Sequence, residues 1–413
     1  MIWPSTATRD ARLMMRTRAF RGFVDGAISV VLASYLTLLG FSPLQIGAIV
    51  TSTLLGSAAL TLTLGLVAHR HTRRRMLAGA CLLMTATGLG FAGVTTFWPL
   101  ILVAFVGTLN PSVGDVSVFL PIEQAVLADA VSPPQRTSVF ALYNLSGALA
   151  GAFGALAAGI PLWLANHAGF SLLDAHRTMF LGYAVVALAM GLMYRGLSER
   201  EEAPNANSVQ RPLAESRRIV LKLATLFSLD SLGGGLVVQS LMAFWLYRRF
   251  NLSVESTGAA FFAMGVLSAA SQLLSAPLAA RFGLINTMVY THLPANIFLI
   301  TAAFMPTAPW ALALLLLRMA LSQMDVPARQ SYVMSVVPPQ ERSAAASVTN
   351  VPRSLAAALT PLAAGAMLEH SSFGWPLVCG GLAKAAYDLL LLAQFRSVPP
   401  RCEAADAVEP VVS

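Results

Sequence analysis

Charged residues are scarce in this chain, because Asp, Glu, Lys and Arg together make up 11% of its 413 residues. A soluble globular domain carries roughly 25% charged residues. Hydrophobic residues make up 56% of the sequence. This balance excludes an ordinary soluble enzyme, an intrinsically disordered chain and a collagen-like repeat.

Cysteines and the motifs of common catalytic sites are also missing or few. The three cysteines, Cys81, Cys379 and Cys402, lie far apart and lack C-x-x-C spacing, so neither a zinc site nor a disulfide framework is indicated. No G-x-x-x-x-G-K-[ST] phosphate loop and no H-E-x-x-H motif occurs, and the six histidines are scattered. We therefore expect no enzyme, no catalytic residues, no metal, no cofactor and no ATP-driven step.

Long apolar runs, in contrast, are abundant. A helix needs about 20 apolar residues to cross a hydrocarbon core about 30 Å thick. Twelve segments meet this requirement, and we expect an all-α integral membrane protein with twelve transmembrane helices. The predicted spans are 20–39, 46–68, 76–95, 99–127, 138–164, 178–194, 219–246, 255–280, 285–305, 310–334, 344–368 and 375–395.

The basic residues indicate how these spans are oriented. If the N-terminus is inside, twenty of the 27 Lys and Arg residues, Arg21 among them, lie on the cytoplasmic side and three, Arg177, Arg248 and Arg249, lie outside. Because Lys and Arg favour cytoplasmic loops, we expect a multi-pass protein of the inner (cytoplasmic) membrane with both termini cytoplasmic. The net charge of +8 then reflects topology and attraction to anionic lipid, so the bilayer is an expected partner and nucleic acid is not. The leader 1–18 has no apolar core, so no signal peptide is expected before the first span.

The chain also repeats itself. A polar stretch at 194–218 separates six spans from six. A shift of 206 residues aligns Pro121/Pro327, Gln124/Gln330, Pro133/Pro339, Arg136/Arg342 and Asn144/Asn350, and a shift of 211 aligns Ser42/Ser253, Gly47/Gly258 and Arg70/Arg281. We expect two pseudo-symmetric six-helix bundles. The expected organisation is a cytoplasmic arm at 1–18, a first bundle at 19–195, a cytoplasmic linker at 196–218, a second bundle at 219–396 and a disordered cytoplasmic tail at 397–413.

One span contains a predicted interruption. The fourth span carries the run Asn110-Pro-Ser-Val-Gly-Asp115. Proline removes a backbone donor and clashes with the preceding turn, so this run predicts a break or kink in the helix.

The twelve spans in two repeats, a basic loop after the second span and a Gly-rich fifth span (Gly147, Gly151, Gly154 and Gly159) resemble the major facilitator superfamily over nearly the whole chain. The loop motif of that family, G-x-x-x-D-R-x-G-R-R, occurs in degenerate form at 65–75, where His69 replaces the acidic residue, and at 276–283, where Ala280 does. The resemblance implies a monomeric transporter for a small molecule that works by alternating access, with spans one, four, seven and ten lining the cavity. The family-like residues Arg70, Asp129, Arg136 and Arg342 are candidates for closing the cytoplasmic side.

Ionisable side chains inside the spans are the main candidates for function, because each is costly to place at membrane depth. Asp25 in the first span and Asp230 in the seventh occupy related positions in the two repeats. A carboxylate removed from water holds a proton more readily, so both are candidates for proton coupling. The alternative for Asp25 is structural, as a helix cap or as a partner of Arg18 or Arg21.

A second group lies on the tenth span. Asp325 and Arg329 are four residues apart and can pair on one helix face, and Arg318 lies about two turns earlier. Glu123 in the fourth span is the repeat equivalent of Arg329. We expect these two charges to pair as a gate, with a static bridge as the alternative. Asp325 and Glu123 are further candidates for proton coupling, and Arg318 is a candidate for the substrate cavity.

The remaining candidates carry less information. Lys384 and Asp388 on the twelfth span are four residues apart, so we expect them to neutralise each other. Arg353 is expected at the cytoplasmic interface. Other candidates for the substrate cavity are Asp115, Gln239, Trp245, Asn144 and Asn350. Helix capping for the aspartate and hydrogen bonds between helices for the asparagines are the alternatives.

Together these features predict a secondary active transporter that moves a small solute by alternating access. Proton-coupled efflux of an organic compound or toxic solute is the specific expectation. Proton-coupled uptake is the alternative, and a non-transporting membrane receptor is the alternative from another class.

Overall fold

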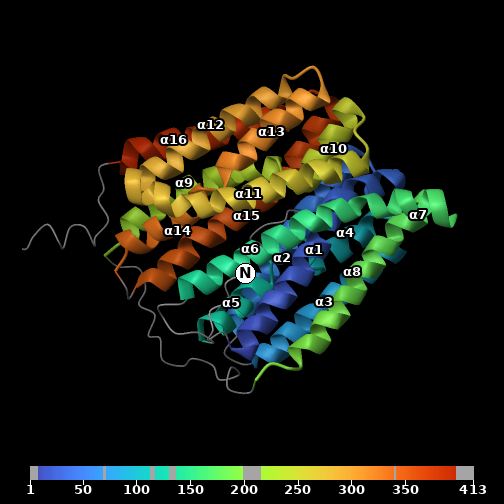
Figure 1. The fold of residues 1–413 in the computed structure, drawn as a ribbon, viewed down its shortest axis with the longest axis horizontal. Coiled ribbons are helices and arrows are strands. Elements are labelled where there is room, and N and C mark those ends of the chain that lie inside the picture. Colours follow the sequence, from blue (N-terminus) through green and yellow to red (C-terminus); the bar gives the residue numbers. More distant parts are fainter. Residues whose placement is uncertain are drawn as a thin grey trace, which may run out of the picture. The chain divides into compact units, whose positions relative to one another are not determined.

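The computed structural model describes residues 8–67, 71–111, 117–129, 136–198, 215–338 and 341–396. Within these ranges the regular structure is entirely helical (Figure 1). The helices of the first half are α1 (Arg9–Leu38), α2 (Pro43–Val67), α3 (Arg73–Gly93), α4 (Phe97–Val106), α5 (Phe119–Asp129), α6 (Arg136–Leu156), the short 3-10 helix η3 (Ala157–Gly159), α7 (Ile160–Ala168) and α8 (Leu172–Tyr194). Those of the second half are α9 (Arg217–Leu236), α10 (Gln239–Phe250), α11 (Val254–Phe282), α12 (Leu284–Ala303), α13 (Ala308–Ser322), α14 (Asp325–Val336), α15 (Arg342–His370) and α16 (Trp375–Phe395).

The helices account for the twelve predicted spans. Ten helical segments of the described chain are long and apolar enough to cross a membrane. The two other spans are the fourth, formed by α4 and α5, and the ninth, formed by α12. The expected fold class, an all-α integral membrane protein with twelve transmembrane helices in two six-helix bundles, is confirmed.

Two spans of the described chain are interrupted near a proline, which cannot donate a helical hydrogen bond. The predicted break of the fourth span is present between α4 and α5, where the described residues 107–111 and 117–118 are not helical. The tenth span is interrupted at Gln323 and Met324 in the same way, although its sequence is predicted to form one continuous helix. Pro121 and Pro327 occupy the third residue of α5 and of α14, so neither can donate a bond back to the preceding turn. The two halves of the chain therefore share the position of this helix break as well as their sequence pattern.

Two other helix boundaries differ from the prediction. The seventh span is divided into α9 and α10 at Val237 and Val238, whose backbone leaves the helical region. The first helix begins at Arg9 rather than near Phe20, because the Thr8 hydroxyl accepts from the Ala11 N–H at 3.2 Å and caps it. Part of the expected cytoplasmic arm is thus helical.

By their contacts the helices form two compact units. The first unit contains residues up to 205 together with 238–266 and 361–373. The second unit contains 206–237, 267–360 and the residues from 374 onward. The α10 helix, the start of α11 and the end of α15 therefore pack with the first half of the chain, although they belong to the second half of the sequence.

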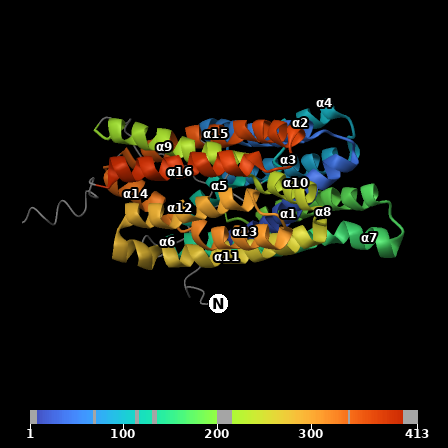
Figure 2. The ribbon, with the colours of Figure 1, turned by 90° about the horizontal axis from the view of Figure 1, so that it is seen from above.

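Glycines set the closest helix contacts inside each unit. In the first unit, a methyl group on Gly22 or Gly26 of α1 would clash with the backbone of Gly147 or Gly151 of α6. The Gly-rich fifth span is therefore explained by close packing against the first. In the second unit, α9 and α16 run side by side (Figures 1 and 2), and a methyl group on Gly233 would lie 2.6 Å from the carbonyl oxygen of Gly380 on α16.

Candidate functional site

Glu123 on α5 is a fully buried carboxylate whose two oxygens both accept hydrogen bonds from one arginine. Its side chain is 0% exposed, and it accepts hydrogen bonds from Arg21 Nη1 at 3.0 Å and Arg21 Nη2 at 2.6 Å. The hydroxyls of Thr17, Tyr143 and Tyr194 also donate to this carboxylate. A bidentate arginine and three hydroxyl donors leave Glu123 fully paired, which is the condition under which a buried charge is tolerated.

The local sequence explains how these groups meet. Thr17, Arg21 and Asp25 are spaced by four residues and therefore share one face of α1. The Arg21 guanidinium lies over the ring of Phe119, the first residue of α5, with 4.7 Å between Cζ and the ring centroid. The network therefore joins α1 to α5, α6 and α8. It depends on the break before α5, because this break lets α5 begin at Phe119, beside Arg21.

Asp25 lies one helical turn beyond Arg21 and forms no ion pair in the described part of the chain. Its side chain is buried, with 4% of the residue exposed, and its Oδ1 has no hydrogen-bond partner among the described residues. No ion pair joins Asp25 to any residue that the structure describes, because the neighbouring Arg21 is engaged by Glu123. A buried carboxylate in this state is unstable as an anion.

Asp230 on α9, the repeat counterpart of Asp25, has the opposite environment. Its Oδ1 accepts from Lys384 Nζ at 2.6 Å, and its Oδ2 accepts from Arg329 Nη1 at 3.1 Å. The Nε2 atom of His292 lies 3.8 Å from Oδ1. Three cationic or cation-forming groups therefore surround this buried carboxylate, and they stabilise it as an anion.

The polar network continues through α12 to α16. His292 Nδ1 lies 2.9 Å from Asp388 Oδ1, and the Asn296 amide donates to Asp388 Oδ2 at 2.9 Å. On α14, Arg329 also contacts Asp325 at 3.4 Å, as their spacing of four residues predicts. All of these side chains are buried. His292 is thus placed between Asp230 and Asp388, where it can hold a proton against either carboxylate.

Hydrophobic side chains surround this network within the second unit. Phe227, Met288, Tyr332, Tyr387 and Leu391 belong to one buried cluster contributed by α9, α12, α14 and α16. These are the same four helices that carry the charged groups. The ionic contacts therefore lie in apolar surroundings, where each is stronger than it would be in water.

The two halves carry related ion pairs with the signs exchanged. In the first half the cation, Arg21, is on the first span and the anion, Glu123, is on the fourth. In the second half the anion, Asp230, is on the first span of the repeat and the cation, Arg329, is on the fourth. Glu123 and Arg329 are the pair that the repeat aligns. Each half therefore joins its first span to its fourth with a buried salt bridge.

Lys384, Asp388 and Arg21 lie in other surroundings than the sequence predicts. The predicted pair between Lys384 and Asp388 is wrong, because Lys384 contacts Asp230 and Asp388 contacts His292. The gate between Glu123 and Arg329 stays a prediction, since each of the two residues pairs within its own unit here. Arg21, expected among the cytoplasmic arginines, is 2% exposed and serves the buried network instead.

The candidates for the substrate cavity are dispersed. Trp245 on α10 is 0% exposed, and its Nε1 has no hydrogen-bond partner among the described residues. Gln239 at the start of α10, Asn144 on α6 and Arg318 on α13 are half-buried, and Asn350 on α15 is exposed. Their role in binding a substrate stays a prediction.

Some candidates cannot be placed. Asp115 and Arg70 lie outside the described residues, and so do the side chains of Asp129, Arg136 and Arg342. Arg353, expected at the cytoplasmic interface, donates from Nε to the Ser231 hydroxyl at 3.0 Å.

Sequence reasoning missed several members of the networks. His292 is one of six scattered histidines in the sequence, although its place inside the ninth span is a signal that it has a buried partner. Asn296 lies one turn after it and offers the same signal. Thr17 and Tyr194 give none, because an uncharged hydroxyl near the end of an apolar helix is common.

Comparison with known proteins agrees with this architecture. The family model of the Major Facilitator Superfamily matches residues 17–361 and 248–407. A relative from Saccharomyces cerevisiae, the uncharacterized membrane protein YJR124C, is 26% identical over 431 aligned positions that cover 95% of each chain.

Solved structures show the same fold at low identity. The nucleoside transporter NupG has a TM-score of 0.72 and 16% identity over 94% of this chain and 100% of that one. The inward-open xylose transporter XylE from E. coli has a TM-score of 0.73 and 14% identity over 94% and 97% of the two chains. The chain belongs to the Major Facilitator Superfamily and has the fold of a multi-pass membrane transporter.

Proposed function

We propose that this protein is a proton-coupled secondary transporter that exports a small organic solute by alternating access, and that Asp25 binds the coupling proton. It acts in this proposal as a monomer in the cytoplasmic membrane with both termini inside. The observation that carries the proposal is the buried Asp25 carboxylate, whose Oδ1 has no hydrogen-bond partner and which forms no ion pair in the described part of the chain.

The physical argument starts from desolvation. An ionised carboxylate without a counter-ion is strongly disfavoured in an apolar environment, so burial favours the uncharged acid. Exposure of the same group to water on one side of the membrane favours release of the proton. A carboxyl group whose access to water changes with conformation is therefore suited to carry a proton across.

The neighbours of Asp25 support this assignment. Arg21 would be its natural partner one turn away, but Glu123 holds that guanidinium with two hydrogen bonds. The close contact between Gly26 of α1 and Gly151 of α6 lies directly beside Asp25. The Gly-rich helix α6 thus packs closely against the helix that carries the acid.

Asp230 receives a different role in the proposal. Its contacts with Lys384 and Arg329 keep it ionised, so it orders the second network instead of carrying the proton. In this proposal Asp25 carries the proton, and Asp230, its counterpart in the repeat, is a permanent counter-ion.

The test uses inverted membrane vesicles with an imposed pH gradient and a fluorescent probe of that gradient. A panel of organic cations, organic acids and neutral compounds is added to vesicles with wild type, Asp25→Asn or Asp174→Asn. Asp174 is the matched control, because it is an aspartate of the same unit with a side chain that is 53% exposed. We expect at least one compound to dissipate the gradient in wild type and in Asp174→Asn, but not in Asp25→Asn.

A second measurement separates loss of coupling from loss of folding. Exchange of a labelled compound between the two sides needs binding and conformational change but no net proton movement. We expect Asp25→Asn to keep this exchange. Proton movement that persists in Asp25→Asn contradicts the role of Asp25, and accumulation driven by an inward proton gradient in right-side-out vesicles contradicts export in favour of symport.

A further inference from the structure

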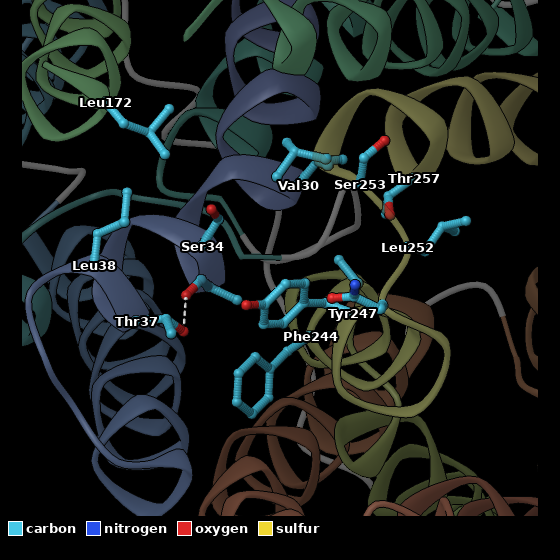
Figure 3. A pocket seen from close by; sticks show the side chains of 14 residues that line it. Val30, Ser34, Thr37, Leu38, Leu172, Phe244, Tyr247, Leu252, Ser253 and Thr257 are labelled. Carbon is cyan, nitrogen blue, oxygen red and sulfur yellow. Dashed lines mark hydrogen bonds between the residues drawn. The ribbon is translucent and has the colours of Figure 1, made fainter. Parts of the chain in front are cut away.

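A cavity of about 360 Å³ lies within the first unit, away from both charged networks. Its walls come from α1 and α8 of the first half and from α10, the following loop and α11 of the second half (Figure 3). None of the described residues of the Glu123 network or of the Asp230 network lines it. Asp25, which carries the proposed proton coupling, does not line this cavity.

The lining combines an apolar body with hydroxyl groups, and its described residues include no charged side chain. Val30, Leu38 and Phe244 contribute apolar surface, and Tyr247 and Thr257 contribute hydroxyls. Figure 3 shows the Tyr247 ring lying across the cavity with its hydroxyl turned toward α1. A charged ligand would find no counter-charge here and would lose its hydration, so the chemistry selects against ions.

Two of the hydroxyls are available for a ligand. Those of Thr37 and Ser34 already bond, to the Ala33 carbonyl at 2.8 Å and to His176 Nε2 at 3.2 Å. Tyr247 and Thr257 have no side-chain hydrogen bond to any described residue, although Thr257 is only 2% exposed. Thr257 thus has a buried hydroxyl that lacks a partner in the described chain and that a ligand would satisfy, whereas Tyr247 is 47% exposed.

We propose that this cavity binds a small uncharged molecule with an aromatic or branched alkyl body and one hydroxyl or carbonyl group. The body would lie against Phe244 and Val30, and the polar group would bond to Tyr247 and Thr257. The volume is at the lower end of the range for small-molecule pockets. The proposal goes beyond transport, and its test needs no transport measurement.

The probe is a benzyl alcohol that carries a trifluoromethyl-diazirine group, an uncharged aromatic alcohol that reacts with nearby atoms on illumination. The purified full-length protein is labelled in lipid nanodiscs and the modified residues are mapped by mass spectrometry. We expect saturable labelling of α1, α10 and α11 at the cavity, with competition by unmodified benzyl alcohol.

Hydroxyl deletion supplies the sharper part of the test. Tyr247→Phe and Thr257→Val keep the shape of the side chain and remove one hydrogen bond, so each should raise the half-saturating probe concentration about five-fold. Tyr290→Phe is the matched control, because Tyr290 is a tyrosine on α12 that is 59% exposed and does not line the cavity. It should leave the labelling unchanged.

A variant that fills the cavity provides the opposite check. Ala243 lines the cavity, and Ala243→Phe should abolish the saturable labelling while the protein remains monodisperse. Labelling that rises in proportion to the probe, spreads evenly over lipid-facing helices or is equal to wild type in Tyr247→Phe and Thr257→Val overturns the proposal. The first two results would assign the cavity to lipid.

Discussion

At the scale of single residues, the partners of a buried carboxylate, more than its burial, decide whether it is stable as an anion. Asp25 and Asp230 are related by the repeat and are both 4% exposed, yet one has no ion pair in the described chain and the other contacts Lys384 and Arg329. The same residue type therefore has a different chemistry in each half. Position in the sequence identified both carboxylates but did not distinguish them, because their partners lie on other helices.

Lys384 offers a direct test of which partner it uses. A double-mutant cycle between Lys384→Met and Asp230→Asn should give a coupling energy of about 0.5–3 kcal/mol, because the two side chains are in contact at 2.6 Å. The cycle between Lys384→Met and Asp388→Asn should give a clearly smaller coupling. The measurement is the unfolding free energy in a denaturing detergent titration. A larger coupling with Asp388 would restore the pairing expected from the spacing along the helix.

The candidate site was predictable in part. Glu123, Asp325, Arg329, Asp25 and Asp230 could be found because an ionisable group inside an apolar run stands out. The bonds between them could not, because a pair such as Arg21 with Glu123 joins residues about 100 positions apart and depends on how α1 packs against α5.

At the scale of helices, glycines decide how closely two elements approach. A methyl group at Gly26 would overlap the backbone of Gly151, whereas one at Gly182 of α8 would meet no described atom within 4 Å. Gly26→Ala should therefore lower the free energy of unfolding by about 1–3 kcal/mol through overpacking. Gly182→Ala, the matched control, should be neutral or stabilising by up to about 1 kcal/mol.

Thermal unfolding of the two purified variants checks this prediction. If Gly26→Ala unfolds at the wild-type temperature, then α1 and α6 are far enough apart at Gly26 and Gly151 to accommodate a methyl group. Transport by Gly26→Ala is a second readout, because the substitution lies next to Asp25.

Helix boundaries show where sequence reasoning succeeds and where it fails. The break before α5 was predicted because Pro111 lies inside an apolar run. The equivalent break before α14 was not, because Pro111 has no proline counterpart at position 317 and the aligned pair Pro121 and Pro327 lies beyond the break. The division at Val237 has no proline, and the glycine run at 233–235 just before it weakens a helix without fixing where the helix ends.

At the scale of the molecule, the two sequence halves meet within the first unit. The Glu369 carboxylate at the end of α15 accepts from the Leu44 N–H at 2.8 Å and from the Ser42 hydroxyl at 3.1 Å, at the start of α2. Gly47 and Gly365 allow the two helices to touch beside this contact. A carboxylate at a helix N-terminus is stabilised by the free N–H groups and by the helix dipole.

If the two sequence halves separate at this end during transport, we expect this contact to break. Glu369→Gln weakens a charge-assisted hydrogen bond that is exposed to solvent and therefore worth about 0.5–1 kcal/mol, so it should shift the equilibrium toward the open form about two- to five-fold. Spin labels at Thr95 and His370, in a background without the native cysteines, report the separation at this end. Glu255→Gln is the matched control, since Glu255 is an exposed glutamate of the same unit. An unchanged distance distribution in Glu369→Gln would show that this contact does not hold the end closed.

The self-contained ion pairs have a consequence for how the protein is made. Arg21 and Glu123, with both tyrosines that bond to the carboxylate, lie within residues 21–194, so they are complete before the ribosome reaches the second half. The Asp230 network is equally complete within its own half. Neither half has to wait in the bilayer with these charges unmatched for the other to arrive. Each of the two ionic networks can therefore form during translation without residues from the other half.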